Sequence, residues 1–329
     1  MIKSLAWNTV GVVCVLAGAL SALSHVRAAE PAQAESQKEL SWAQGDGFVA
    51  LRQKDQVVWQ FNYGPTEDKP CFHPVAIAGG PTLTQDRPED HVWHRALWFS
   101  WKFINGVNYW EPDLKTMKMV GRTVVKDARI DTPPDFSARI TMDIAYGLAD
   151  QEPLLTEKRL VEVTPPDASG GYMLDWRMTF TAGSQKVVLD RTPLPGEPDG
   201  KVHGGYAGLS VRFAREMTEI QATNTEGPIE FEAGRYRGPS MGMDYCGRFD
   251  GKEAGIAILD HPRNLNSPSP WYVIHNAKMA YYSPAVIQQG PHTLEPGESM
   301  TLQYRVLVHA GRLSAEQLRE AVKRYTGGK

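Results

Sequence analysis

Cysteine is scarce in this chain, and neither sign of charge prevails. Three cysteines occur in 329 residues, and 35 Lys and Arg residues nearly balance 38 Asp and Glu residues, which leaves a formal net charge of −3 at pH 7. Because no basic stripe runs along the sequence, the usual mark of a nucleic-acid-binding protein is missing. Glycine-rich phosphate loops of the P-loop and Rossmann types are missing as well. We therefore expect no nucleic-acid partner and no cofactor.

Long apolar runs are missing everywhere except at the amino terminus. Lys3 supplies a positive charge there, the apolar stretch 10–20 follows, and Ala28 provides a small residue before a cut at Ala29. This order is typical of a secretory signal peptide. An uncleaved anchor is the alternative, although a spanning helix needs ~20 apolar residues. We predict a signal peptide over residues 1–28, a periplasmic or secreted protein, and no membrane span after cleavage.

The rest of the chain divides into a short leader and a long β region. Residues 29–46 begin with a polar stretch rich in Ala, Gln and Glu, which predicts a flexible lead-in. Residues 47–329 are predicted to form one domain, since β-sandwiches commonly reach ~200–250 residues or more. An oxidising compartment permits a disulfide between Cys71 and Cys246. Two half-buried free thiols are the alternative.

Alternation of apolar and polar residues is the main structural signal of the long region. Apolar side chains occupy every second position of 172–180 and again of 300–308. A period of two predicts strands with one buried face. Clusters rich in proline and glycine separate such segments. Further strands are predicted at 57–63, 138–146, 156–163, 187–190, 208–213, 255–259 and 271–275.

One helix is predicted at the carboxyl end of the chain. Ser314 and Gln317 have the spacing of a capping box. Apolar residues then recur at helical spacing from Leu318 to Tyr325. Many strands without alternating helices predict packed antiparallel sheets. The expected fold is therefore all-β, an antiparallel β-sandwich with a C-terminal helix.

The segment 69–101 holds the densest mixture of polar and aromatic side chains in the chain. His91 and His94 are the best candidates for acid–base catalysis, because an imidazole changes charge near neutral pH. Asp90, the neighbour of His91, could orient an imidazole and favour its charged form. The alternative is that these histidines are structural and brace a long loop.

Three further residues of this segment are candidates for holding a substrate. The planar guanidinium of Arg95 could bind a carboxylate or a sugar hydroxyl. Trp98 offers an aromatic face, which suits the apolar C–H patches of a pyranose ring. His73 belongs to the same polar loop, and loops on a rigid scaffold are where binding sites usually lie.

Two segments further along the chain could complete this site. Tyr206 and Arg212 bracket a glycine-rich approach to a predicted strand, where glycines permit a close backbone approach. A glycine-eased turn into a buried strand is the alternative. Asp260 and His261 stand where another predicted strand ends, a position suited to a cleft. We include Asp260 among the catalytic candidates and His261 among the substrate-binding ones.

A metal site is left open by the sequence. Asp90, His91, His94 and His73 could supply ligands, but the pattern D-H-x-x-H is not specific in the way that H-E-x-x-H on a helix is. The cysteines do not have the spacing of a zinc site.

Several runs resemble a family of bacterial proteins that is commonly labelled the PmoA family or methane oxygenase PmoA. The runs that carry the resemblance are Phe72–Pro74, Leu83–Thr84, Asp86–Pro88, Asp90–His91, His94–Arg95, Leu97–Phe99, Asn105–Gly106, Gly204–Arg212, Asp260–Asn264 and Leu294–His309. Family members commonly read D-H-P-H-H-R-G where this chain has Asp90–Ala96. Val92 and Trp93 therefore replace Pro and His, and Ala96 replaces Gly.

The resemblance implies a β-supersandwich similar to galactose mutarotases rather than a multi-span methane monooxygenase subunit. Folds of that kind use paired histidines and a carboxylate for acid–base work on a sugar. By this resemblance, His91 and His94 would be acids, and Asp90, Asp190 or Asp260 would be the base. The analogy concerns the fold, which does not fix function.

Two main hypotheses follow for the function. The first is a secreted carbohydrate-active enzyme, a hydrolase, lyase or epimerase, that applies His/Asp acid–base chemistry to a carbohydrate or another small-molecule substrate. The second is a non-catalytic carbohydrate-binding or cell-surface module, because aromatic stacking needs no titratable group. A metal-dependent oxidoreductase is a third and weaker hypothesis.

Overall fold

Antiparallel β-sheets dominate the computed structural model, which describes Met1 and residues 39–327. The predicted signal peptide lies outside the described residues, apart from Met1. The nine-stranded sheet has the order β1 (Leu40–Gly45), β2 (Phe48–Gln53), β3 (Gln56–Asn62), β4 (Cys71–Val75), β5 (Leu97–Ser100), β13 (Gly208–Arg212), β19 (Met279–Pro284), β18 (Pro270–Asn276) and β15 (Arg235–Pro239). Every pairing within it is antiparallel.

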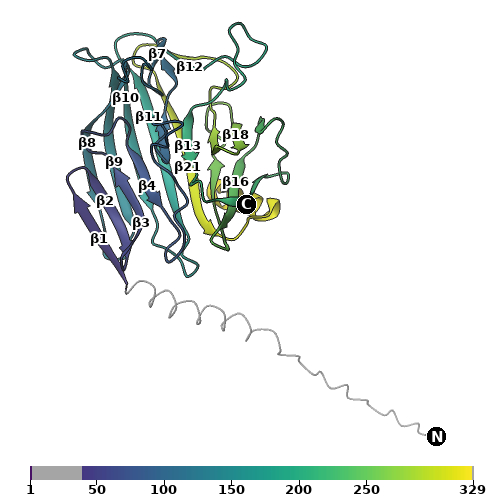
Figure 1. The fold of residues 1–329 in the computed structure, drawn as a ribbon. Helices are drawn as coiled ribbons and strands as arrows, with labels where there is room; N and C mark the ends of the chain where they lie inside the picture. Colours follow the sequence, from purple (N-terminus) through teal and green to yellow (C-terminus); the bar gives the residue numbers. More distant parts are fainter. Residues whose placement is uncertain (2–38, 328–329) are drawn as a thin grey trace.

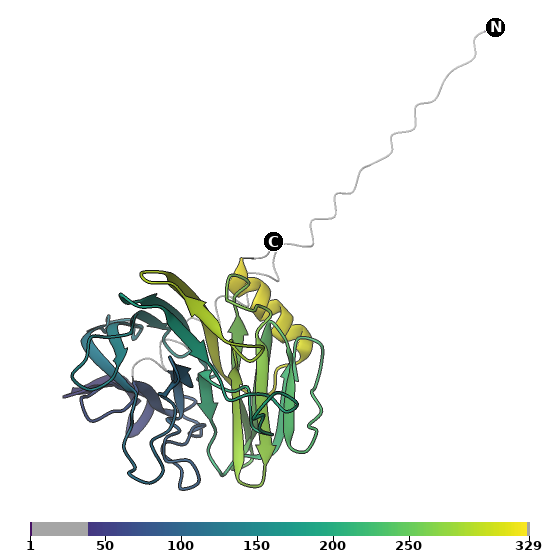
Figure 2. The same ribbon diagram turned by 90° about the horizontal axis from the view of Figure 1, so that it is seen from above.

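A second large sheet packs against the first, and a small sheet lies beside them (Figures 1 and 2). The eight-stranded sheet has the order β14 (Thr218–Asn224), β16 (Gly242–Phe249), β17 (Lys252–Asp260), β21 (Ser299–Ala310), β11 (Tyr172–Ala182), β10 (Leu155–Val163), β9 (Ala138–Gly147) and β8 (Arg122–Asp131). The four-stranded sheet has the order β20 (His292–Leu294), β12 (Val187–Asp190), β6 (Phe103–Ile104) and β7 (Val107–Asn108). The expected all-β antiparallel fold is confirmed.

The main hydrophobic core lies between the two large sheets. In β11 the alternate residues Leu174, Trp176 and Met178 are buried, as the period-two pattern predicts. Polar contacts also cross the core: the Tyr282 hydroxyl donates a hydrogen bond of 2.7 Å to the Ile256 carbonyl oxygen. Buried tyrosine hydroxyls need such acceptors. The two sheets are therefore joined by specific hydrogen bonds as well as by apolar packing.

A second aromatic cluster covers the opposite face of the nine-stranded sheet. In β18, Trp271 and Val273 belong to the main core, whereas Tyr272 and Ile274 belong to this second cluster. Because successive side chains of a strand point to opposite faces, the two clusters must lie on opposite sides of the sheet. We call this second group the outer aromatic cluster; it comprises Cys71, Trp98, Trp110, Ala207, Tyr272, Ile274, Tyr281 and Ala285.

The predicted C-terminal helix is present as α2 (Ala315–Thr326), and it contacts the eight-stranded sheet (Figure 2). Its buried residues Leu318 and Ala321 pack with Ala257 and Leu259 of β17. Ser314 caps the helix through a capping box with Gln317, which satisfies backbone donors that a helix start leaves unpaired.

Replacing Ser314 with alanine should lower the free energy of unfolding by about 1 kcal/mol. The change removes the acceptor for the Gln317 backbone N–H, a hydrogen bond of 3.2 Å. Urea unfolding followed by circular dichroism measures this loss. Ser314→Asp keeps a capping acceptor and is the control, so an equal loss in both variants would contradict the role of the cap.

Two expectations about the chain are revised by the structure. The strand β1 lies inside the segment 29–46 that was expected to be a flexible lead-in, and it pairs with β2 from Leu40 to Gly45. A six-residue edge strand of which only Leu40 is buried gives a weak sequence signal, because the period-two pattern arises from burial of one face. Cys71 and Cys246 are both free, and both are fully buried rather than half-buried.

No helix among the described residues is long and apolar enough to cross a membrane.

Candidate functional site

Most of the predicted site residues meet on the outer face of the nine-stranded sheet. Asp90, His91, His94 and Arg95 lie on one loop, residues 86–96, which we call the histidine loop. This loop is closed by a bridge between Asp86 and Arg95 and by short backbone hydrogen bonds such as His94 N to His91 O, 2.9 Å. It lies over β13 and the outer aromatic cluster, which brings Arg212, Trp98 and Tyr206 to the same region.

A chain of polar contacts holds His91 in place. Arg212 Nη2 on β13 donates to both carboxylate oxygens of Asp90, at 2.8 and 2.9 Å. The other end of this chain is His91 Nδ1, which lies 2.9 Å from Asp90 Oδ2. Burial favours the neutral carboxyl, but the hydrogen bonds from Arg212 and His91 outweigh it and lower the pKa of Asp90. Asp90 is therefore a carboxylate that orients His91.

The hydrogen bond to Asp90 fixes which nitrogen of His91 can react. An ionised carboxylate only accepts hydrogen bonds, so Nδ1 carries the hydrogen. Nε2 is then the nitrogen with the free lone pair, and His91 lines a cavity on the outer face. The His91 side chain is 31% exposed, which leaves it accessible to a ligand. A neutral imidazole oriented by a carboxylate in this way can accept a proton at Nε2.

His94 lies beneath His91 and is not suited to the same task. Its ring centroid is 4.6 Å from that of His91 and 5.3 Å from that of Trp98, and Nδ1 is buried with no hydrogen-bond partner. Burial, reinforced by the neighbouring imidazole of His91 and the charge of Arg212, holds the pKa of His94 well below 6.5. His94 is thus neutral at physiological pH and supports the ring of His91.

The lowered pKa of His94 predicts a loss of stability in mild acid. As the pH falls below 6.5, the unfolded chain takes up a proton at His94 that the folded chain does not. The free energy of unfolding should therefore fall by up to ~1.4 kcal/mol per pH unit from this group. Urea unfolding from about pH 7 to about pH 5 measures it, with His94→Phe as the comparison. Identical pH profiles for the two proteins would contradict the assignment.

The cavity that His91 faces is lined mainly by aromatic rings. Its volume is about 350 Å³. It is formed by the histidine loop, the segment 110–114, the segment 203–206 and the strands β15, β18 and β19. We call it the aromatic pocket; its lining residues are His91, Trp93, His94, Trp110, Glu111, Leu114, His203, Tyr206, Arg235, Tyr272, Ile274, Asn276, Met279 and Tyr281.

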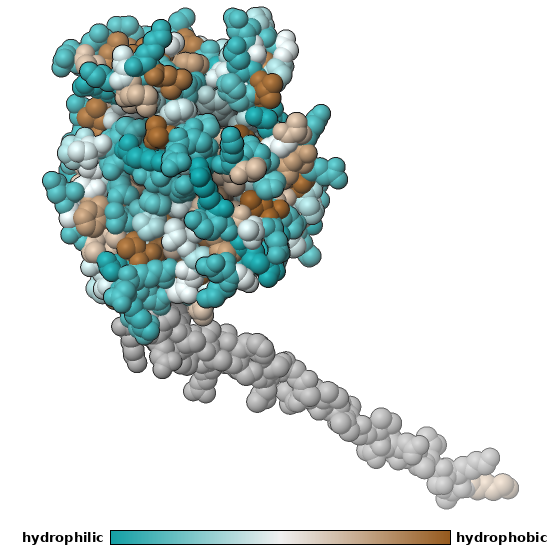
Figure 3. Space-filling view, viewed as in Figure 1, coloured by the Kyte–Doolittle hydropathy of each residue, from teal (hydrophilic) through white to brown (hydrophobic). Residues whose placement is uncertain are grey.

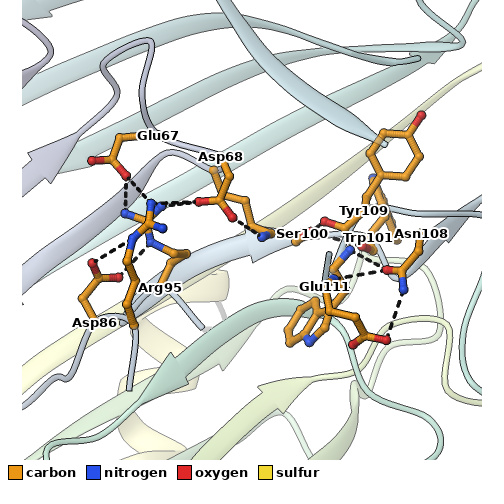
Figure 4. A network of polar contacts seen from close by, with 12 residues as sticks. Glu67, Asp68, Asp86, Arg95, Ser100, Trp101, Asn108, Tyr109 and Glu111 are labelled. Atoms are coloured by element: carbon orange, nitrogen blue, oxygen red, sulfur yellow. Dashed lines mark hydrogen bonds and ion pairs between the residues drawn. The ribbon is translucent and has the colours of Figure 1, made fainter. Parts of the chain in front are cut away.

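Glu111 is the carboxylate of this pocket, and the sequence analysis did not identify it. Lys102 pairs with its Oε1, which also accepts a hydrogen bond of 3.1 Å from Asn108 Nδ2. Tyr206 donates to the other oxygen at 3.4 Å. Figure 4 shows the Glu111 carboxylate beside the Asn108 amide. Because these partners come from different strands and loops, Glu111 has a fixed position at the pocket wall.

Arg95 has a structural position rather than a substrate-binding one. Figure 4 shows its guanidinium enclosed by Glu67, Asp68 and Asp86, and it is 1% exposed. The Nε atom donates to Asp86 Oδ1 at 2.8 Å, while the two terminal nitrogens pair with Asp68 and Glu67. Burial favours the neutral carboxyl of Asp68, yet Lys69 and Arg95 lower its pKa to about 2. The cluster anchors one end of the histidine loop and engages Nε and both terminal nitrogens of the Arg95 guanidinium.

Four other predicted residues do not reach the aromatic pocket. Asp260 is fully buried at the end of β17, where Asn264 and the Ser269 backbone N–H hold its carboxylate. Its neighbour His261 lies against Tyr325 of α2. His73 forms a hydrogen bond of 3.2 Å with the Thr84 hydroxyl, and both residues line a separate surface hollow. Asp190 accepts from Arg191 at the end of β12. Strand order separates them from the pocket, and a linear sequence does not reveal that order.

One short motif resembles the serine elbow of hydrolases but has a different structure. Gly238–Gly242 reads G-x-S-x-G, and its Ser240 lies between β15 and β16 rather than between a strand and a helix. The side chain is 5% exposed, and its hydroxyl donates to the Gly242 carbonyl oxygen and bonds Thr225. Ser240 therefore stabilises a bend.

Within residues 39–327, no group of three or more His, Cys, Asp and Glu side chains is placed to hold a metal ion.

The sequence profile of one protein family matches residues 48–323. The chain therefore belongs to that family, which is described as "Family of unknown function (DUF6807)". The matched range includes every residue that lines the aromatic pocket. No curated protein sequence matches the chain significantly.

Solved structures with a related arrangement include two galactosidases. An α-galactosidase from Lactobacillus brevis aligns with a TM-score of 0.41 and 9% identity over 84% of this chain and 39% of that chain. The galactosidase domain of an α-galactosidase–sucrose kinase gives 0.41 and 8% over 83% and 41%. A proposed aldose 1-epimerase from Klebsiella pneumoniae subsp. pneumoniae gives 0.38 and 11% over 88% and 89%. The chain thus spans about two fifths of the two galactosidase chains.

Proposed function

We propose that the aromatic pocket binds a sugar or glycoside and that His91 acts on it as a general base. One observation carries this proposal. The imidazole of His91 is held by the Asp90 carboxylate through Nδ1, so that its Nε2 is free beside a pocket lined by aromatic rings. An oriented base next to a ring-binding surface is what proton transfer on a sugar requires.

The walls of the pocket supply both kinds of contact that a sugar needs. The Tyr206 ring lies 5.3 Å from the Trp110 ring and 6.1 Å from the Tyr272 ring, centroid to centroid. These rings offer apolar faces to the C–H groups of a pyranose. Glu111 and Arg235 line the same pocket, and their polar groups can bind hydroxyl groups.

The proposed proton transfer uses two residues of the chain. His91 Nε2 accepts a proton from a hydroxyl or an acidic C–H of the bound sugar, and the imidazolium that forms is stabilised by Asp90. The carboxylate stays ionised, since its pKa is already lowered. In the reverse direction the imidazolium returns the proton. Hydrolysis, elimination and epimerisation of a sugar all begin or end with such a transfer, and the proposal extends to this class of reactions.

A non-catalytic sugar-binding module is the second candidate, and one observation favours it. Glu111 is already paired with Lys102, and burial holds the pKa of His94 well below 6.5, so these two titratable groups of the pocket are poorly suited to proton transfer. A pocket that only binds needs no more than the aromatic rings and hydroxyl partners. The two candidates share a ligand class and differ in turnover.

Turnover on defined sugars distinguishes these candidates. The purified protein is incubated with free aldoses, aryl glycosides and oligosaccharides, and products are followed by mass spectrometry and by the anomeric signals in proton NMR. New products or accelerated anomeric exchange would support catalysis. Saturable binding without any chemical change across the panel would favour the binding module. If the protein shows no binding and no turnover on any of these sugars, both candidate functions are contradicted.

The amino-terminal segment and the family resemblance complete the proposal. We propose that residues 1–28 direct export to the periplasm or the exterior, where saccharides are encountered. Amino-terminal sequencing of the exported protein should begin at Ala29, and an intact Met1 would contradict cleavage. The resemblance to the PmoA-labelled family, with the mutarotase-like sugar chemistry that it implies, is consistent with a carbohydrate ligand.

A further inference from the structure

A second and larger cavity adjoins the aromatic pocket. Its volume is about 850 Å³, and it lies around the turn of the β18–β19 hairpin, between the histidine loop and the segment 213–220. We call it the basic cavity. Its charged or titratable lining residues are Glu89, Asp90, Arg212, Arg215, His275 and Lys278.

The lining of the basic cavity contains more cationic side chains than carboxylates that are free to pair with them. Asp90 is already engaged by Arg212 and His91, which leaves the exposed Glu89 as the other carboxylate of the lining. Arg215 Nη2 lies 3.8 Å from Asp90 Oδ1, beyond hydrogen-bond distance. Lys278 forms no ion pair within the described part of the chain. Both cationic side chains are exposed and can approach a ligand.

Two buried polar groups of the cavity lack hydrogen-bond partners. Arg212 is 1% exposed, and its Nε and Nη1 have no acceptor, although Nη2 has three. His275 Nδ1 is likewise buried without a partner. Burial lowers the pKa of Arg212, and the hydrogen bonds to Asp90 oppose this effect without cancelling it. An unpaired buried donor is costly, and an anion nearby would reduce that cost.

The basic cavity and the aromatic pocket share lining residues. Asn276 and Met279 line both, while the adjacent residues Asp90 and His91 line one each. The two cavities therefore meet at the turn of the β18–β19 hairpin. Guanidinium and ammonium groups bind carboxylates and sulfates through charge-assisted hydrogen bonds.

We propose that the basic cavity binds an oxyanion, a carboxylate or sulfate ester, carried by the sugar unit next to the one at His91. The substrate class would then be an acidic saccharide. The identity of the substrate rests on the proposed function, whereas the oxyanion site itself can be tested without any sugar.

The first experiment probes the anion alone. Sodium acetate and sodium sulfate are titrated, against sodium chloride at equal ionic strength, into isotope-labelled protein, and backbone amide signals of residues 213–217 and 276–279 are followed by NMR. Saturable shifts are expected for the wild type and should be lost in Arg215→Gln/Lys278→Gln. Arg177→Gln/Lys126→Gln removes the same charge from exposed positions of the eight-stranded sheet and should behave as the wild type.

The second experiment probes saccharides in matched pairs. Neutral oligosaccharides are compared, by calorimetry or on a glycan array, with counterparts whose C6 carries a carboxylate or a sulfate. The wild type should bind the acidic member about tenfold more tightly, as expected for a charge-assisted hydrogen bond. The Arg215→Gln/Lys278→Gln protein should lose this preference and keep its affinity for the neutral member.

The outcomes separate the two proposals. Neutral saccharides that bind as tightly as acidic ones, without saturable anion shifts, would overturn the oxyanion site and leave the proposed function intact. Saturable anion binding with no saccharide binding would keep the site and discard the proposed function. A preference for acidic ligands that survives the double substitution would also overturn the role of this cavity.

Discussion

Replacing His91 with asparagine is expected to lower turnover by a factor of about 10²–10⁴, the usual contribution of general acid–base catalysis. The asparagine side-chain amide can occupy the place of Nδ1 and still donate to Asp90, so the histidine loop keeps its anchor to Arg212. What is lost is the free lone pair of Nε2. Steady-state kinetics on a substrate found in the turnover panel measures the loss, which should fall on kcat more than on KM.

Two comparisons make this result specific. His292→Asn changes a half-buried histidine of β20, which does not line the aromatic pocket, and should leave kcat unchanged. Saccharide binding by the His91→Asn protein should persist, because the aromatic rings are intact. Full activity of a folded His91→Asn protein would rule out His91 as the base, and unchanged binding with no wild-type turnover would favour the binding module.

Replacing Arg95 with methionine should lower the free energy of unfolding by about 3–5 kcal/mol. Methionine has a similar length but no charge, so the carboxylates of Glu67, Asp68 and Asp86 lose their most buried cation. Arg95 is 1% exposed, and its removal leaves the three part-buried carboxylates with Lys69 and the half-exposed Arg87 as their remaining cations. Chemical unfolding with two independent probes measures the change.

An exposed ion pair provides the matched control. Arg129 pairs with Asp127 at 3.2 Å on β8, where the two side chains are 81% and 53% exposed. Arg129→Met should change stability by less than ~1 kcal/mol, because solvent screens such pairs. Equal losses in the two variants would show that burial of the Arg95 cluster contributes nothing beyond a surface pair. If the Arg95→Met protein folds but no longer binds saccharides, the ion cluster around Arg95 is required to position the histidine loop.

The strands of the two large sheets were predictable where one face is buried. The segments 172–180 and 300–308 have an apolar residue at every second position, and they form β11 and β21, which pair with each other in the eight-stranded sheet. The strand β1 was missed because it is short and buries only Leu40, and β8 because its side chains are mostly exposed. Burial creates the pattern, so strands with little burial leave little trace in the sequence.

The local part of the site was predictable, and the part assembled from distant segments was not. Asp90 and His91 are adjacent in the chain, so their contact follows from their spacing. Glu111 and Tyr272 reach the pocket through loop geometry and strand order, which single-sequence patterns do not encode. In 271–275 the alternation was visible, but only the sheet arrangement shows that Tyr272 belongs to the outer face.

Ala96 adopts a backbone conformation that is usually occupied by glycine. Ala96, where the resemblance described above would place a glycine, adopts φ 68° at the end of the histidine loop. A residue with a Cβ is strained in this left-handed region, whereas glycine is not. Arg87 at the other end of the loop also has a positive φ, 47°. The fold therefore imposes this loop conformation even on a side chain that disfavours it.

The pairing of β11 with β21 also sets when the protein can fold during synthesis. Thr181 pairs with Ser299, and the intervening chain includes β12 to β20. Contacts of such wide sequence separation slow folding, because a long loop must close before they form. Until its last segment leaves the ribosome, the nascent chain exposes the β11 edge, which is open to intermolecular pairing. Premature termination before residue 299 should therefore yield an aggregating product rather than a smaller folded domain.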